Sequence, residues 1–178
     1  MKLGLLLFAA GLAALIVQGA LALLLPPPLC PDLGLLVVLA IGLYWQSLPG
    51  GFALATLLGY AADVLSGSLM GLHAFLRLLS FATAALAGRQ LNLRGPLPLA
   101  VFAGALAFVY GAAVHLITSF FGAGGELSLA AAAELVVHAI VDMLVAPLVA
   151  SAVARLCAWS GEEDAPQRGF RLRSEGLR

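Results

Sequence analysis

The chain has 178 residues, of which 62% are hydrophobic and only 10% are charged, and its formal net charge is zero. Soluble domains carry about 25% charged residues, so this composition excludes an ordinary soluble protein. Eight of the eighteen charged side chains lie after Ser160, which leaves an almost uncharged body and a charged tail. The two cysteines, Cys30 and Cys157, do not have the spacing of a disulfide framework or a zinc site.

Six apolar stretches predict an all-α, polytopic membrane protein with a six-helix transmembrane domain over residues 1–159, because a bilayer core needs about 20 helical residues. They cover about residues 3–25, 33–48, 52–65, 72–87, 97–121 and 127–159. Pro26-Pro27-Pro28 ends the first stretch, and Pro49-Gly50-Gly51 is predicted to be the turn after the second. The second and third stretches are short, so a single re-entrant hairpin at residues 33–65 would give five spans. A signal peptide at the start is a weaker alternative to the first span.

The basic residues favour one orientation of these six spans. Cytoplasmic loops carry an excess of Lys and Arg. Six spans place Lys2, Arg89, Arg94, Arg168, Arg171 and Arg173 on one side of the membrane. The loops at Asp32, at residues 66–71 and at Glu126 contain neither Lys nor Arg. We therefore expect both termini in the cytoplasm. Residues 160–178 are expected to be a disordered cytoplasmic tail, or else a docking segment for a partner or for anionic lipid.

Seven titratable side chains fall inside the predicted spans or at their edges, where an Arg, Lys or Asp costs at least about 2.5–3.5 kcal/mol at a helix centre. They are Asp63, His73, Arg77, His115, Glu134, His138 and Asp142. The pair His73/Arg77 and the series Glu134/His138/Asp142 each repeat every four residues, so each set shares one helix face. We expect all seven to face the bundle interior or a water-filled cavity, and the two stripes to pair across the bundle. In a tight hairpin, Asp63 would meet Arg77 or His73.

Three interpretations of these polar residues stay open. They pair with one another and fix which helices touch, they line a pocket for a ligand or partner that opens outward, or they form a proton or cation path or a metal site. The metal interpretation is the weakest, because no HExxH motif or second histidine cluster accompanies the stripe. No nucleophile motif, phosphate loop or nucleic-acid patch is present. We expect no catalytic residue, no cofactor and no enzyme activity.

Small residues recur along the third and fifth stretches, among them Gly59, Gly104 and Gly111. Small side chains let helix backbones approach closely in a membrane. The pattern predicts close packing of helices within the chain, with a dimer face as the alternative.

Two motifs carry a resemblance to a known family. Pro31-Asp32 opens the second span, and Asp63-x-x-Ser66-Gly67-x-x-x-Gly71-x-His73 joins the third span, with its Gly59, to the fourth. In this region, residues 31–74, the chain resembles the rod shape-determining protein MreD family, and its length and hydropathy are similar over residues 1–159. The matching positions are Pro31, Asp32, Gly59, Asp63, Ser66, Gly67, Gly71 and His73, and their expected role is structural.

The resemblance implies a non-catalytic scaffold subunit of the bacterial cell-elongation complex, which supports rod shape and peptidoglycan synthesis at the inner membrane. Family members bind MreC and associate with the MreB filament, RodA and its class B penicillin-binding partner. The family is also similar in fold to the substrate-binding subunits of energy-coupling factor transporters, so a solute-binding or transport subunit is the alternative. A lipid-handling role is a weaker third. Cys30 stands where a basic residue is expected, and the Glu134/His138/Asp142 stripe and the tail are not part of the family pattern.

Overall fold

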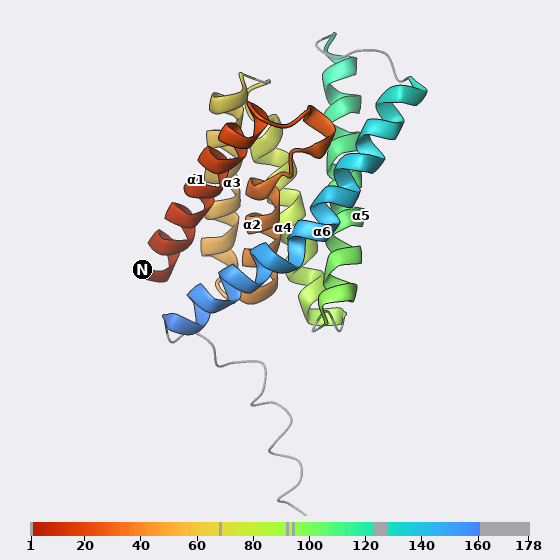
Figure 1. The fold of residues 1–178 in the computed structure, drawn as a ribbon. Coiled ribbons are helices and arrows are strands. Elements are labelled where there is room, and N and C mark those ends of the chain that lie inside the picture. Colours follow the sequence, from red (N-terminus) through yellow and green to blue (C-terminus); the bar gives the residue numbers. More distant parts are fainter. Residues whose placement is uncertain (1, 68, 92, 94, 123–127, 161–178) are drawn as a thin grey trace, which may run out of the picture.

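The protein is an all-α bundle in its computed structural model, which describes residues 2–67, 69–91, 93, 95–122 and 128–160. The helices are α1 (Lys2–Ala22), the 3₁₀ helix η1 (Pro27–Leu29), α2 (Leu33–Tyr44), α3 (Leu48–Ser66), α4 (Leu72–Gln90), α5 (Pro96–Phe120) and α6 (Leu129–Trp159). The six α-helices run alternately up and down, as Figure 1 shows. The predicted six-helix membrane bundle is confirmed.

Five segments are long and apolar enough to cross a bilayer: α1, residues Pro27–Tyr44, α3, α5 and α6. The remaining helix, α4, is as long as α3, at 19 residues, but it is less apolar, and its polar residues include Arg77 and Ser80. Both of these side chains are buried in the bundle. α4 lies beside α2 and α3 (Figure 1).

The centre of the bundle is α2. Nine of its 12 residues are buried, and it packs against α1, α3, α4 and α6. A Cβ atom added at Gly42 would lie 2.8 Å from the Cβ of Ala84, so α2 and α4 approach closely there. At about 1.5 Å per residue, α2 spans about 18 Å, which is shorter than the hydrocarbon core of about 30 Å. Its two ends therefore cannot both lie at the membrane surface.

Two helix boundaries differ from those predicted. Pro49-Gly50-Gly51 is not a turn but the first turn of α3, which begins at Leu48. The Ser47 hydroxyl caps this helix by accepting the Gly50 N–H at 3.4 Å. Proline is compatible with a first helical turn, because its missing N–H has no partner there in any case. The true break is at Trp45–Ser47, and α1 ends at Ala22, before the three prolines.

The exposed basic residues that the structure describes gather at one end of the bundle. Lys2 lies at the start of α1, Arg89 in the last turn of α4 and Arg155 near the end of α6, all at the lower end in Figure 1. Cys30 follows η1 at the upper end, and Cys157 lies in the last turn of α6 at the lower end. The predictions for Arg94, Glu126 and residues 161–178, with Arg168, Arg171 and Arg173, lie outside the described residues.

Candidate functional site

The segment that leads into α2 descends into the bundle before the helix begins. Cys30, Pro31 and Asp32 are all buried. Irregular backbone at membrane depth requires a partner for every N–H group, since lipid supplies none. Proline has no N–H to satisfy, and this segment contains Pro26, Pro27, Pro28 and Pro31. Pro31 is buried in this entry and has no N–H to satisfy, whereas Pro26 and Pro27 are exposed before it.

The N–H groups that remain at this entry all have acceptors. Asp32 donates its N–H to Asp142 Oδ1 at 2.8 Å, and Gly34 donates to Gln18 Oε1 at 3.2 Å. Leu35 donates to Asp32 Oδ1 at 2.8 Å, so Asp32 is the N-cap of α2. Side chains from α1, α6 and the cap itself therefore fix the start of α2 inside the bundle.

Arg77 of α4 is the cation at this point. Its Nη2 contacts Asp32 Oδ1 at 3.0 Å, and its Nη1 donates to the Leu58 carbonyl oxygen of α3 at 3.0 Å. The Arg77 side chain is 2% exposed, and its Nε has no hydrogen-bond partner within the described chain. A Cβ atom at Gly34 would lie 2.7 Å from Nη2, so the guanidinium packs directly on the α2 backbone. One side chain thus joins α2, α3 and α4.

The two predicted stripes meet through Asp32 and not directly. Asp142 of α6 is fully buried and holds the Asp32 N–H with one oxygen. Its other oxygen, Oδ2, lies 3.5 Å from His138 Nε2, but the geometry is not that of a hydrogen bond. We call Asp32, Arg77 and Asp142 the polar core. It connects α4 to α6 across the N-terminus of α2.

Asp63 caps the next helix. Its carboxylate accepts the backbone N–H groups of Gly71, His73 and Ala74 at 3.0, 2.8 and 3.2 Å. The expected contact of Asp63 with His73 is therefore present, and it is made through the backbone N–H of His73. The expected contact of Asp63 with Arg77 is replaced by the pairing of Arg77 with Asp32.

Glycines shape the α3–α4 hairpin around this cap. Gly67 and Gly71 have φ values of +63° and +91°, which side chains rarely adopt, so both turns of the hairpin require glycine. A Cβ atom at Gly59 would lie 2.4 Å from the Cα atom of Ala74, so the α3 and α4 backbones touch. The Ser66 hydroxyl donates to the Asp63 carbonyl at 3.5 Å, within the last turn of α3. Each of these motif positions therefore has a structural reason.

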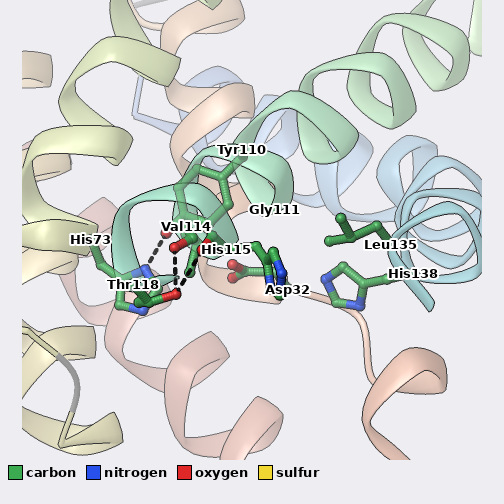
Figure 2. A pocket seen from close by; sticks show the side chains of 9 residues that line it. All are labelled: Asp32, His73, Tyr110, Gly111, Val114, His115, Thr118, Leu135 and His138. Carbon is green, nitrogen blue, oxygen red and sulfur yellow. Dashed lines mark hydrogen bonds between the residues drawn. The ribbon is translucent and has the colours of Figure 1, made fainter. Parts of the chain in front are cut away.

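A pocket of about 330 Å³ opens beside the polar core, between α5 and α6. It is lined by Asp32, His73, Tyr110, Gly111, Val114, His115, Thr118, Leu135 and His138. All three histidines of the chain are in this set. Figure 2 shows Asp32, His115 and His138 gathered in the pocket, with His73 and Tyr110 beside them. The Nδ1 atom of His73 is hydrogen-bonded to the Tyr110 hydroxyl at 2.6 Å.

Six of the seven predicted membrane-depth residues lie in this region or at the hairpin that supports it. His115 and His138 line the pocket, and Asp142 lies directly behind His138. Glu134 is the exception, because it is exposed on α6 and does not line the pocket. The expectation that it faces the interior is wrong. Glu134 lies in the second turn of α6, near the N-terminus of the helix, where a carboxylate can reach the membrane surface.

Sequence reasoning missed the central position of Asp32 and the contributions of Gln18 and Tyr110. Asp32 was assigned to a loop, since it follows a proline-rich stretch. One signal could have placed it: Asp is a preferred N-cap, and the apolar run from Leu33 is too short to start at the membrane surface. Gln18 is the one polar side chain in the apolar stretch 3–25, which is a signal for an interior position. Tyr110 had no distinguishing signal.

The site offers hydrogen-bond acceptors and a small apolar wall. Among the described residues, no group of three or more His, Cys, Asp or Glu side chains has an arrangement that could hold a metal ion. Thr118 donates its hydroxyl to the Val114 and His115 carbonyls at 2.8 and 3.0 Å, so it keeps only acceptor capacity toward the pocket. Such a site can bind a molecule that carries hydrogen-bond donors.

Comparison of the chain with protein families, with curated proteins and with solved structures gives no match in any of the three.

Proposed function

We propose that the chain is a non-catalytic scaffold subunit of the bacterial cell-elongation complex, placed in the inner membrane, and that it binds MreC. The proposal rests on the resemblance of residues 31–74 to the MreD family. It assigns the MreB filament, RodA and the class B penicillin-binding protein as further members of the same assembly. Both termini would then lie in the cytoplasm.

The observation that supports this proposal most is how the matching residues are used. Asp63 accepts three backbone N–H groups of the α4 N-terminal turn, and Gly59 brings the α3 backbone against α4. Asp32 caps α2 and pairs with Arg77. A family motif whose residues fix helix positions suits a subunit that presents a rigid surface to a partner helix.

The outward surface of the bundle suits contact with other membrane helices. Large apolar side chains are exposed along the helices, for example Ile16 at 69%, Val109 at 59% and Leu144 at 71%. In a membrane these side chains face either lipid or another helix, and association there depends on close packing. A single transmembrane helix of MreC would bind by this type of contact.

The first test is co-purification from the source bacterium. The chain, tagged and extracted in mild detergent, is expected to bring down MreC, and deletion of its gene is expected to turn rod-shaped cells into spheres. Mass spectrometry of the purified complex and light microscopy measure the two outcomes. Recovery of the chain without MreC, together with normal rods after deletion, would contradict the proposal.

A pair of variants separates the scaffold role from general damage. Gly59→Leu would force α3 and α4 apart, and it should lower MreC recovery and cell-shape complementation together. Gly19→Leu is the matched control, because a Cβ atom there meets nothing within 4 Å and the position is exposed. The Gly19 variant should keep both functions, with both variants compared at equal amounts in the membrane.

A further inference from the structure

The pocket between α5 and α6 is a feature that the scaffold role does not use. Its volume of about 330 Å³ is within the range of small-molecule sites, which begin at about 300 Å³. Its walls combine apolar surface from Val114 and Leu135 with the polar side chains described above. Convergent polar groups in an apolar cavity are the usual form of a ligand site.

Three polar atoms in or beside this pocket have no hydrogen-bond partner among the residues that the structure describes. Both hydrogen bonds to the Asp32 carboxylate go to Oδ1, which leaves Oδ2 without a bond to any residue the structure describes. Nε2 of His115 and Oδ2 of Asp142 are buried and also have no hydrogen-bond partner in the described chain. Buried polar atoms are almost always partnered in native proteins. The two carboxylate oxygens can only accept, and a neutral imidazole nitrogen can accept as well.

The charged side chain that lines the pocket is a carboxylate, that of Asp32. Asp142 and Arg77 lie beside the pocket and are not among its lining residues, and Arg77, which is 2% exposed, is already paired with Asp32. Glu134 is exposed on α6 one turn from His138. Among the residues that the structure describes, no Lys or Arg lines the pocket. An anion entering here would meet the Asp32 carboxylate, whereas a cation would be attracted to it.

We propose that this pocket binds a small organic ammonium group, with its N–H donors directed at Asp32 Oδ2 and His115 and its carbon chain against Val114 and Leu135. A free amine and the ethanolamine headgroup of a phospholipid present the same ammonium chemistry. The proposal does not depend on the scaffold role, since a chain that fails to bind MreC can still bind an amine.

The test uses the full chain purified in a neutral detergent, with its thermal unfolding midpoint as the readout. Ethylammonium chloride is titrated against sodium chloride at equal ionic strength, and ethanol and sodium propionate serve as neutral and anionic probes. A ligand at about 100 times its Kd should raise the midpoint by about 5 °C or more. A separate arm compares nanodiscs of phosphatidylethanolamine with nanodiscs of phosphatidylglycerol. If phosphatidylethanolamine raises the unfolding midpoint relative to phosphatidylglycerol and ethylammonium does not raise it, the bound ammonium is that of the lipid headgroup.

Variants locate the effect. Val114→Phe fills the pocket and should abolish the shift, while Val109→Phe changes the same residue type on the lipid-exposed side of α5 and should keep it. His115→Leu removes one acceptor and should weaken ammonium binding at least tenfold. This variant replaces Val114→Phe in the test if Val114→Phe does not fold. The proposal is overturned if sodium gives the same shift, if propionate stabilises instead, if neither amine arm stabilises, or if the pocket variants respond like Val109→Phe.

Discussion

Arg77 stabilises the bundle by bonding in two directions at once. One end of its planar guanidinium contacts Asp32 on α2, and the other donates to the Leu58 carbonyl on α3. Lysine has a single ammonium on a flexible stem and cannot reproduce this fork. Breaking a buried ion pair by removing one partner costs about 3–5 kcal/mol, because the remaining charge is left uncompensated. We expect Arg77→Met to lower the free energy of unfolding in detergent by that amount, and Arg77→Lys to recover only part of it.

Two further variants make this prediction specific to the pair. Asp32→Asn combined with Arg77→Met should cost less than the sum of the single changes, with a coupling energy of about 0.5–3 kcal/mol. Arg155→Met is the control, because Arg155 is an exposed arginine near the end of α6. If Arg77→Met is as mild as Arg155→Met, the pair does not stabilise the bundle.

Residue spacing predicted some of these contacts and could not predict others. The cap by Asp63 followed from a local pattern, since Asp63 and the N–H groups it binds are at most 11 residues apart. The partner of Arg77 lies 45 residues away in the sequence, and that of the Asp32 N–H lies 110 residues away. A helical repeat identifies which side chains share a face. It does not identify the distant segment of the chain that contacts them, here the segment before α2.

At the scale of helices, the α3–α4 contact depends on Gly59. A methyl group there would lie 2.4 Å from the Ala74 Cα and 2.6 Å from the His73 carbonyl oxygen, and a backbone atom cannot move aside as a side-chain tip can. We expect Gly59→Ala to destabilise the bundle by about 1–3 kcal/mol, which is the usual cost of overpacking. The midpoint of thermal unfolding measures the change.

Gly19→Ala is the matched control for this helix contact. It adds the same methyl group to α1, where the new Cβ atom would meet no other described part of the chain within 4 Å. Alanine is a better helix former than glycine by about 0.8–1.0 kcal/mol, so Gly19→Ala should be neutral or stabilising. Equal destabilisation by both changes would mean that α3 and α4 are not in backbone contact.

Helix existence followed from hydropathy more reliably than helix ends did. Proline and glycine at residues 49–51 predict a turn, but the Ser47 cap makes these residues the start of a helix. The charges of α4 lower its hydropathy, and only the interior position of Arg77 explains how the helix fits a bundle in a membrane. The start of α3 is decided by its N-cap, and the fit of α4 is decided by its position in the bundle. The average hydropathy of a stretch of sequence reports neither.

For the whole molecule, the sequence predicted the bundle but not the pocket. Apolar stretches are enough to predict six antiparallel helices, because each must satisfy its own backbone in lipid. The pocket needs residues of α5, among them Tyr110, His115 and Thr118, to line the same space as Asp32, His73 of α4 and His138 of α6. The position of Asp32 depends on the short α2 and its buried entry, which no periodicity reveals.

The orientation of the bundle is a whole-molecule prediction with a direct test. Lys2, Arg89 and Arg155 lie at one end, which the positive-inside rule assigns to the cytoplasm. In a background of Cys30→Ala and Cys157→Ala, we would introduce Met70→Cys after α3 or Leu91→Cys after α4, at positions that are 70% and 54% exposed. A membrane-impermeant maleimide should label the Met70 variant in intact spheroplasts, and the Leu91 variant only after permeabilisation. The reverse pattern would invert the bundle, and equal labelling of both in intact spheroplasts would contradict α4 as a membrane-crossing helix.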